Sequence, residues 1–381
     1  MKNIVKISIA AAAFAFALAA CTDIENSTGG TGLKEGSDAT PEPIALMPLT
    51  YTPTKSIVTG TEFPSESAIV AAAWFNTDTG DSTGAKYFEN FTFIKGYGLD
   101  SGDAGKWGAD KTAYWPVKGT LCIMAFRPDT LASGTPNYNA ETKVTPTWQD
   151  SSTLKLAIEK LREDQDILVG ANRAAKKGSD AITFHHINSL IEIQVKSSKD
   201  FVKQGSDEYP SGIELCGVII EDVYKSYDSD GVTITRTAGT NDLTISAGNV
   251  TGDNADYTIL NKETTTDSLK LSTALRPLDG ETANTNHPGG KEPGKRVIVP
   301  AQTPTTMTIY YKLYNGSSAD ASPMLTCDEI PLKISEEEAN NKWAAGKKYT
   351  YKVTVSADKV TITPSVSDWD NTDKEVTVQS N

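Results

Sequence analysis

Two adjacent histidines, His185 and His186, are the residues of this chain best suited to bind a metal ion or transfer a proton. They lie in the segment DAITFHHINSLIEIQV, residues 180–195, and the chain has only 3 histidines in all. If the segment is a β-strand, successive side chains point to opposite faces of the sheet, so the two rings cannot share one ion. The third histidine, His287, lies in a Gly- and Pro-rich segment, and no nearby cluster has metal-ligand spacing. We expect one solvent-facing histidine and one partly buried, hydrogen-bonded histidine, with no metal site.

The apolar alternation of this segment changes phase near Asn188 and Ser189. Apolar residues fall at even positions before that point and at odd positions after it: Ile182 and Phe184, then Ile191, Ile193 and Val195. A shift of one residue turns every following side chain to the other face of a sheet. The sequence therefore predicts a bulge or bend at Asn188-Ser189, or a first half that is buried on both faces.

Other chemical patterns are weak. The chain contains no phosphate-binding glycine loop and no dinucleotide fingerprint. The acidic pair Glu163-Asp164 and the run Glu336–Glu338 fall on expected helix surfaces, where solvated side chains are the usual case. The segment YDSDGV, residues 227–232, is similar to a calcium loop but lacks the later glutamate, so we interpret it as a turn. We expect no enzymatic activity and no cofactor.

The length of the chain indicates the number of domains, and its charge argues against some classes of binding partner. The chain has 381 residues, enough for about two domains. It carries 49 Asp and Glu against 36 Lys and Arg. An acidic balance argues against binding to nucleic acid or to an anionic membrane surface through charge.

The N-terminus has the features of a lipoprotein signal peptide over residues 1–20. Lys2 and Lys6 form a basic start, residues 7–20 form an apolar run that is too short to span a bilayer comfortably, and the run ends in Leu-Ala-Ala-Cys. The order of these features predicts cleavage between Ala20 and Cys21 and lipidation of Cys21. The alternative is an ordinary secretory signal followed by a chance cysteine. Several acyl chains on one cysteine would anchor the protein to a membrane without spanning it.

A flexible tether is expected at residues 21–45, because the segment is composed largely of Gly, Ser, Thr, Pro and acidic residues. An exported protein meets an oxidising compartment, where disulfides are possible. Three cysteines remain after lipidation, and an odd number at wide spacing is no disulfide framework. Cys122 and Cys216 lie within apolar runs, so we expect them to be buried as small hydrophobic residues.

Beyond the tether the chain has an all-β pattern. Segments rich in Val, Ile, Thr, Tyr and Phe are bounded by Gly, Pro, Asn and Asp, and they predict strands at 67–76, 86–95, 112–116, 119–128, 166–172, 182–197, 212–223, 231–236, 256–260, 295–300, 306–314, 347–356, 359–369 and 375–379. The segment YKVTVSADKVTIT predicts a hairpin with Ala357-Asp358 at its turn. Helical spacing and capping predict one helix at 152–164 and a second short helix at 335–349.

This pattern is most simply explained by two β-sandwiches in tandem. We expect an N-terminal sandwich over residues 46–180 and a C-terminal sandwich over residues 181–381, with the boundary near residue 180.

The 6 tryptophans offer a possible platform for sugars. Four of them lie at strand or helix ends, where packing in a core or rim is expected: Trp74, Trp115, Trp343 and Trp369. Trp107 and Trp148 lie in expected loops and are the better candidates for contact with a glycan.

Several segments together resemble the fimbrillins, the lipoprotein subunits of type V pili, including minor-fimbria-like members. The strongest is DILVGANRAAKKGSDAITFHHINSLIEIQV, in which Phe184, His186, Ile191, Ile193 and Val195 fit the family pattern. Asn188 and Leu190 depart from it. AYWP followed by GTLCIMAFRP, VIVPAQT, WAAGKKYTYKVTV and VTITPSVSDW are similar to other family segments and occur in the same order, over roughly residues 66–370.

The resemblance implies two transthyretin-like β-sandwich domains and no enzymatic activity. It also implies export to the outer membrane as a lipoprotein, removal of the N-terminal segment with its first strand by a protease, and filling of the opened groove by an extended segment of the next subunit. Such strand addition takes its affinity from main-chain hydrogen bonds and its register from alternating side chains. The partners would be other fimbrial subunits, and a surface ligand if the subunit sits at a fimbrial tip.

The sequence offers candidates for each step. Residues 44–55 would be the first strand, removed or retained. The C-terminal residues Glu375, Val376, Thr377 and Val378 would be a donor strand, or an ordinary closing strand. Family processing occurs after arginine, whereas this chain has no arginine before Arg127, so Lys34 and Lys55 are the possible processing sites. A retained lipid would suit an anchor or tip subunit better than a stalk subunit.

The function expected from these observations is a structural fimbrial subunit or a fimbria-associated adhesin at the outer membrane and cell surface. The alternative is a glycan-binding surface lipoprotein, which would contact its ligand through Trp107 and Trp148.

Overall fold

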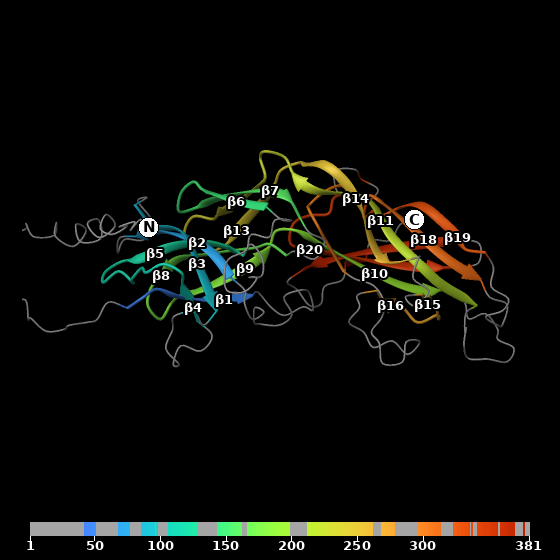
Figure 1. The fold of residues 1–381 in the computed structure, drawn as a ribbon, viewed down its shortest axis with the longest axis horizontal. Helices are drawn as coiled ribbons and strands as arrows, with labels where there is room; N and C mark the ends of the chain where they lie inside the picture. Colours follow the sequence, from blue (N-terminus) through green and yellow to red (C-terminus); the bar gives the residue numbers. More distant parts are fainter. Residues whose placement is uncertain are drawn as a thin grey trace, which may run out of the picture. The chain divides into compact units, whose positions relative to one another are not determined.

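The computed structural model describes most of the chain beyond residue 41. The described residues are 42–50, 68–76, 85–95, 97, 106–127, 143–161, 166–198, 212–261, 268–278, 296–313, 323–335, 337, 341–356, 359–369 and 376–377. They form β-strands and no helix (Figure 1), so the all-β class expected from the sequence is confirmed. Among these residues the structure contains no helix that could cross a membrane.

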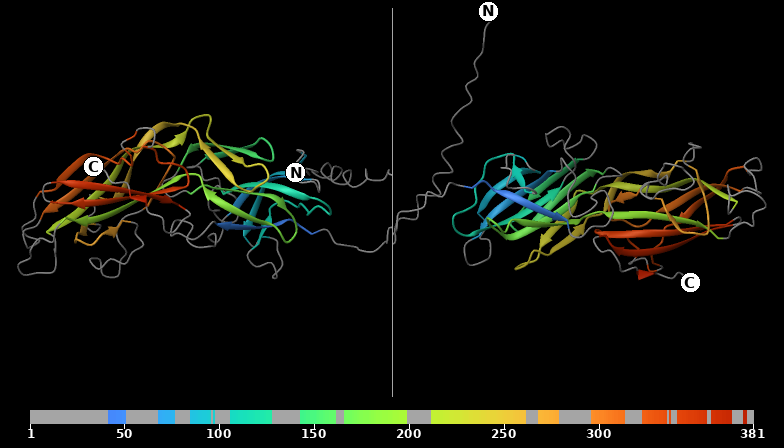
Figure 2. Two further views of the ribbon diagram at one scale, coloured as in Figure 1. Left: turned by 180° about the vertical axis from the view of Figure 1, so that it is seen from behind. Right: turned by 90° about the horizontal axis from the view of Figure 1, so that it is seen from below.

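The first strands form a sheet that closes on itself (Figures 1 and 2). Around the sheet the strand order is β1-β4-β3-β2-β5-β8-β9, and β9 returns to pair with β1. The pairing of β1 with β9 is parallel, whereas the other pairings in this sheet are antiparallel. The strands are β1 (Ala45–Thr50), β2 (Ala68–Asn76), β3 (Lys86–Lys95), β4 (Trp107–Ala109), β5 (Thr120–Arg127), β8 (Leu168–Ala175) and β9 (Ala181–His186).

Strands β2 and β5 are buried on both faces. On β2, Ile69, Ala71 and Ala73 pack inside the closed sheet, and the even-numbered apolar residues pack on its outer face. Strand β5 alternates in the same way between the two clusters. A strand with two buried faces needs apolar residues at nearly every position, which explains the continuous runs in the sequence.

The outer face of the closed sheet packs against a four-stranded sheet of order β13-β12-β7-β6. Its strands are β6 (Lys143–Trp148), β7 (Thr153–Lys160), β12 (Val232–Arg236) and β13 (Leu243–Ala247). The helix expected at 152–164 is wrong, because its described part forms β7. Leu154, Leu156 and Ile158 alternate along one face and are buried, so a period of two decides over the helical spacing of Leu154, Ala157, Ile158 and Leu161.

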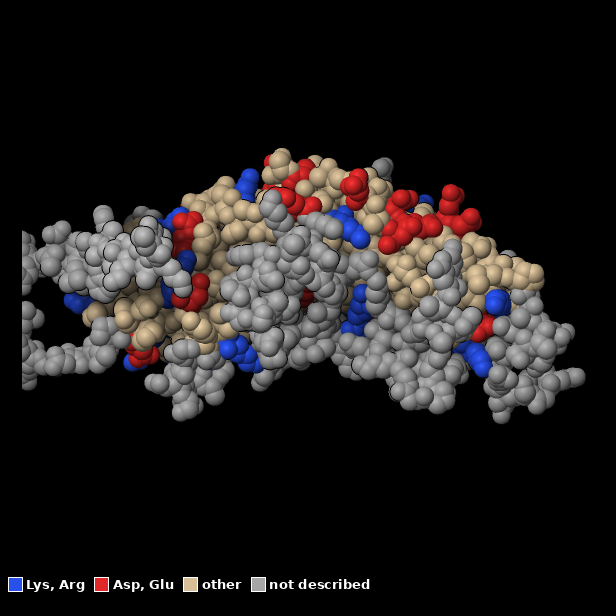
Figure 3. Space-filling model, viewed as in Figure 1, with Lys and Arg blue, Asp and Glu red and all other residues tan. Residues whose placement is uncertain are grey.

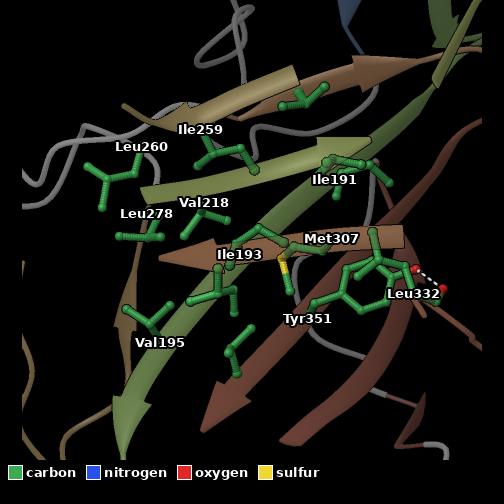
Figure 4. Close-up of a cluster of buried hydrophobic side chains, with 14 of the residues drawn as sticks. Ile191, Ile193, Val195, Val218, Ile259, Leu260, Leu278, Met307, Leu332 and Tyr351 are labelled. Atoms are coloured by element: carbon green, nitrogen blue, oxygen red, sulfur yellow. Dashed lines mark hydrogen bonds between the residues drawn. The ribbon is translucent and has the colours of Figure 1, made fainter. Parts of the chain in front are cut away.

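Two further sheets enclose the C-terminal core (Figure 4). A six-stranded sheet has the order β16-β10-β20-β21-β22, with β17 also on β10, and comprises β10 (Ser189–Ser197), β16 (Arg276–Pro277), β17 (Val297–Val299), β20 (Lys347–Val355), β21 (Val360–Asp368) and β22 (Val376–Thr377). A five-stranded sheet has the order β14-β11-β18-β19, with β15 also on β11, and comprises β11 (Ile213–Tyr227), β14 (Val250–Leu260), β15 (Leu269–Lys270), β18 (Thr306–Leu313) and β19 (Leu325–Pro331). Ile191, Ile193 and Val195 of β10 face β11 and β18 across this core.

The second expected helix, at 335–349, is also wrong over its described residues. Gly346 has a φ of 70°, a left-handed conformation that a helix cannot continue through. Directly after it the chain enters β20, which pairs with β10 on one side and β21 on the other. The expected hairpin of β20 and β21 is confirmed, with Val355 opposite Val360. Its turn residues, Ala357-Asp358, lie outside the described residues.

The phase shift near Asn188 marks a change of sheet. Strand β9 ends at His186 in the closed sheet, and β10 begins at Ser189 in the six-stranded sheet. The expected bend is therefore present, as a complete interruption between two strands. The domain boundary near 180 stays a prediction, and the pairing of β12 with β7 joins segments from both sides of it.

The turn between β11 and β12 requires glycine at position 231. Gly231 has a φ of 57°, and a Cβ there would lie 2.2 Å from the backbone oxygen of Leu156. We expect Gly231→Ala to lower the free energy of unfolding by about 3 kcal/mol, from left-handed strain and the backbone clash together. Urea unfolding of the purified variant measures this loss.

Gly178→Ala is the matched control. Gly178 has a similar φ of 76°, but a Cβ there meets nothing within 4 Å, so only the backbone strain of about 1 kcal/mol is expected. Equal losses for the two variants would contradict the role of the contact with Leu156.

Candidate functional site

The two histidines occupy different environments, as their positions on a strand predict. His186 is buried, and its Nδ1 lies 2.9 Å from each carboxylate oxygen of Asp166, with the hydrogen bond directed to Oδ1. Its ring stacks on the indole of Trp369, with ring centroids 3.8 Å apart and planes inclined by 7°. His185 is half-buried on the other face. The expectation of one buried, hydrogen-bonded histidine is confirmed.

The surroundings of His186 join several distant segments. The backbone N–H of Trp369 donates to the carbonyl of Gly346 at 2.9 Å, and the N–H of Gly346 donates to the carbonyl of Asn188 at 2.9 Å. The Ser189 hydroxyl donates to the carbonyl of Ala344 at 2.8 Å. The pair of His186 and Asp166 therefore lies in a buried joint between β9, β10, the turn before β20 and the end of β21. A ring covered by Trp369 in such a joint is suited to structural support and not to meeting a substrate.

Carboxylates form no metal site in the described part of the chain, where no group of three or more metal-ligating side chains is arranged around an ion position. The segment 227–232 is a turn, as expected: Asp228 Oδ1 accepts a hydrogen bond from the N–H of Asp230 at 3.0 Å. Exposed Asp222, Asp253 and Asp256 lie on β11 and β14, where Figure 3 shows acidic side chains gathered. This acidic surface is consistent with the expectation against nucleic-acid binding.

The three cysteines among the described residues, Cys122, Cys216 and Cys327, are free thiols. Cys122 and Cys216 are buried, as expected. Burial, with Glu214 adding to it, raises the pKa of the Cys216 thiol to about 11, and burial also raises the pKa of Cys122. Thiols with a raised pKa are poor nucleophiles at neutral pH. These cysteines pack as small apolar residues.

The two tryptophans proposed as glycan readers are buried, so that part of the sequence interpretation is wrong. Trp107 is 2% exposed and packs inside the closed sheet. Trp148 is 6% exposed, and its Nε1 donates to Asn90 Oδ1 at 2.7 Å. Both segments form strands instead of loops. Trp74, Trp343 and Trp369 are core residues, as expected, and Trp115 is half-buried.

A Gly-x-Ser-x-Gly pattern at residues 80–84 was missed in the sequence interpretation. It lies outside the described residues, between β2 and β3. These strands are antiparallel neighbours, whereas a nucleophile elbow joins a strand to a helix. The pattern therefore lacks the structural context of a hydrolase site.

Strand β1 is the element with the most unusual position. Its first residues pair with β4, at Ala45–Gly108 and Leu46–Trp107, and the next four residues pair in parallel with β9. Ile44 and Leu46 are buried among the side chains inside the closed sheet. Each contributes about 1.5–3 kcal/mol by its burial. Strand β1 thus closes the sheet and fills part of its interior.

The residues just before β1 continue this pairing on one side. Ile44 N donates to the carbonyl of Ala113 at 2.8 Å, and Trp115 N donates to the carbonyl of Glu42 at 3.1 Å. Pro43 and Tyr114 form an isolated bridge between these bonds. Residues 42–46 therefore pair with β4 and the residues that follow it, whereas residues 47–50 pair with β9.

The C-terminal strand β22 is described at two residues. Val376 and Thr377 lie opposite Val366 and Ser365 at the edge of β21. Glu375 and Val378, the other members of the proposed donor strand, lie outside the described residues. The predicted lipidation and processing positions also lie outside them: Ala20, Cys21, Lys34 and Lys55.

A family model described as fimbrillin-like matches residues 56–369. The chain belongs to the fimbrillin-like family. This is a family of structural fimbrial proteins and is not known for enzymes, and a fimbrial protein acts at the cell surface.

Solved structures similar to this fimbrillin-like chain include a fimbrial protein from Bacteroides vulgatus ATCC 8482, with a TM-score of 0.50, 12% identity and coverage of 85% of this chain and 99% of that one. A protein from Bacteroides uniformis ATCC 8492 that is named for cell adhesion has a TM-score of 0.42 and 15% identity, covering 86% and 99%. The tip fimbrial protein Mfa3 from Porphyromonas gingivalis, with a C-terminal truncation, has a TM-score of 0.33 and 9% identity, covering 86% and 100%. At these identities the similarity bears on the fold alone. No curated protein matches the sequence.

The segments that carried the family resemblance have structural roles in this fimbrillin-like chain. Gln302, of VIVPAQT, is buried and accepts a hydrogen bond from the N–H of Tyr224 at 3.1 Å. Its Nε2 donates to the carbonyl of the same residue at 3.2 Å. The side-chain amide of Gln302 thus makes the two backbone hydrogen bonds to Tyr224 of β11 that a neighbouring strand would make. The sequence interpretation did not identify Asp166 as the hydrogen-bond partner of His186. The hairpin of β8 and β9 could have indicated it, because Leu168 lies opposite His186.

The buried pair of His186 and Asp166 gives a stability prediction. Removing the imidazole leaves a carboxylate with 0% side-chain exposure and takes the stacked ring from Trp369. We expect His186→Ala to lower the free energy of unfolding by about 3–5 kcal/mol, measured by urea denaturation at pH 7.

His185→Ala is the neighbouring control and should cost less than about 1 kcal/mol, because that side chain is only half-buried. In an Asp166→Asn background the cost of His186→Ala should fall, since no charge is left unpaired. A cost that stays the same in this background would contradict the importance of the contact between His186 and Asp166.

Proposed function

We propose that this chain is a structural fimbrial subunit, or a fimbria-associated adhesin, that is exported as a lipoprotein and assembled by strand addition between subunits. In this proposal the fold is two tandem transthyretin-like β-sandwiches, and β1 is the strand that a neighbouring subunit replaces. The position of β1 carries the proposal: one short strand, close to the N-terminal end of the folded part, closes an otherwise continuous sheet.

Removal of β1 would leave a slot with suitable chemistry. Strands β4 and β9 would each present unpaired N–H and C=O groups, which is the template that an added strand needs. The floor of the slot would include Phe93, Ile182 and Phe184, which share the interior cluster with Ile44 and Leu46. An incoming strand must therefore carry apolar side chains at alternate positions.

The C-terminal tail has this pattern. Val376 and Val378 repeat the spacing of Ile44 and Leu46, with one residue between the two apolar side chains. Among its described residues the tail would give up two paired positions on β21 when it leaves its own subunit. The family match ends at residue 369 and begins at residue 56, so both exchange segments lie outside it.

The processing site decides which role the subunit takes. Lys34 precedes β1, so cleavage there would remove the lipid on Cys21 and keep the slot filled. Lys55 follows β1, so cleavage there would release the lipid and β1 together. An uncut chain would keep its lipid and a closed sheet, as expected of an anchor subunit or a tip subunit.

Strand exchange can be tested with the mature chain, residues 21–381, nicked at an engineered protease site after Lys55. We expect a synthetic peptide of residues 370–381 to displace the nicked N-terminal fragment, because its valines fill the positions of Ile44 and Leu46. Release of the fragment on size exclusion, identified by mass spectrometry, measures the exchange. Placing Asp at position 376 of the peptide should weaken displacement at least tenfold, since a charge would enter an apolar interior.

The peptide with Thr377→Asp is the matched control, because side chain 377 points to the opposite face of the added strand. It should displace the fragment nearly as well as the native peptide. Equal displacement by the two aspartate peptides, or none by the native one, would argue against strand addition at the β1 position.

Lipidation is tested separately in cells that express the full chain. Cys21→Ser should abolish incorporation of labelled palmitate and move the protein out of the membrane fraction, because no acyl chain can be attached. Cys327→Ser, which changes a free cysteine of the folded part, should leave both unchanged. Palmitate on the Cys21→Ser protein would contradict the lipoprotein signal.

A further inference from the structure

Exposed aromatic and aliphatic side chains gather beside the beginning of β1. Tyr87 is 40% exposed, Tyr114 is 44% exposed and Val117 is 99% exposed. The hydroxyl of Tyr87 donates to the carbonyl of Tyr114 at 2.7 Å, which fixes the two residues next to each other. Trp115 is half-buried and packs on the core inside the closed sheet. We call Tyr87, Tyr114, Trp115 and Val117 the aromatic ledge.

The aromatic ledge is continuous with the slot that β1 fills. Trp115 and Tyr114 are directly paired with Glu42 and Pro43, the residues that lead into β1. Whatever segment occupies the place of β1 must therefore pass Tyr114 as it enters. Clusters of exposed apolar side chains on a folded surface commonly mark a contact with a partner.

We propose that the aromatic ledge is the docking surface for the body of the donor subunit, a second copy of this chain, during strand addition. The inference rests on the proposed function and adds to it the surface that the two subunits share. It requires the donor tail to enter in the direction of β1, parallel to β9, so that the hydrogen-bond pattern on β9 is kept.

The length of the donor tail sets how close the donor body comes. Trp369 is 1% exposed and is fixed in the core of its own subunit. If Val376 takes the place of Ile44, then Glu375 lies opposite Tyr114, in the place of Pro43. Only the five residues 370–374 then connect the added strand to the donor body. Five extended residues span at most about 17 Å, so the donor body must lie against the end of the slot that carries the aromatic ledge.

Charge supports the same direction of entry. The connecting segment DNTDK carries Asp370 and Asp373, and the exposed side chain of Lys118 directly follows Val117. In the opposite direction Asp370 and Asp373 would lie far from Lys118, and the donor body would lie at the other end of the slot.

The test uses two full mature chains. The acceptor is nicked after Lys55 and carries Val376→Asp, so that it cannot donate its own tail. The donor is the intact chain. Affinity for the intact donor is compared with affinity for the tail peptide of residues 370–381, both by sedimentation velocity or fluorescence anisotropy.

On the acceptor, Val117→Asp and Tyr87→Ser should each weaken binding of the intact donor at least tenfold and change binding of the peptide less than twofold. Val117 is almost fully exposed, so its variant should keep the Tm of the monomer. Tyr87→Phe keeps the ring and should bind the donor almost as the native acceptor does. Met324→Asp is the matched control: Met324 is 40% exposed beside β19, away from the slot, and its variant should bind both partners normally.

The outcomes separate the two proposals. A native acceptor that does not bind the peptide overturns strand addition, and this inference with it. A native acceptor that binds the peptide, together with Val117→Asp and Tyr87→Ser variants that bind the intact donor normally, overturns the aromatic ledge alone. Equal losses of affinity for the peptide and for the intact donor also overturn the aromatic ledge, because the substituted residues would then act in the slot and not on the donor body.

Discussion

Closure of the first sheet by β1 is the constraint on which the rest of the N-terminal structure depends. A sheet with an unpaired edge offers its backbone groups to other chains, and closure removes that edge. Here closure depends on a strand that pairs with β4 over two residues and with β9 over four. The same strand and the residue before it supply Leu46 and Ile44 to the interior. Loss of one short segment would therefore open two edges and an apolar floor at once.

The joint around His186 supports the opposite end of β9. Strand β9 is the parallel partner of β1, and its last residue, His186, is hydrogen-bonded to Asp166. Trp369, which stacks on His186, also lies directly before the C-terminal segment of residues 370–381. The rigid residue at the base of the tail and the strand beside the slot thus meet in one buried cluster, although they are far apart in the sequence.

The sequence predicts these features to different degrees. Where apolar residues alternate without ambiguity, as at Ile191, Ile193 and Val195, the strand and its buried face could be predicted. Residues 152–164 satisfy two periods, and pairing of β7 with β6 and β12 decides between them. Such pairing involves residues that are far apart in the sequence, so it cannot be predicted from local spacing. Trp107 and Trp148 were misplaced for the same reason, because short strands of three and six residues leave little pattern.

Covalent connection explains why a slot of this kind would stay closed until processing. While β1 is attached to the rest of the chain, its effective concentration at the slot is about millimolar for a short flexible linker. A tail from another subunit, present at far lower concentration and with only two valines to bury, cannot compete. A cut after Lys55 removes that advantage without changing any contact in the sheet. An excess of tail can then replace β1, and contacts that β1 lacks would favour the exchange without an excess. The body of a second subunit on the aromatic ledge would supply such contacts, because the donor tail is attached directly to a folded domain.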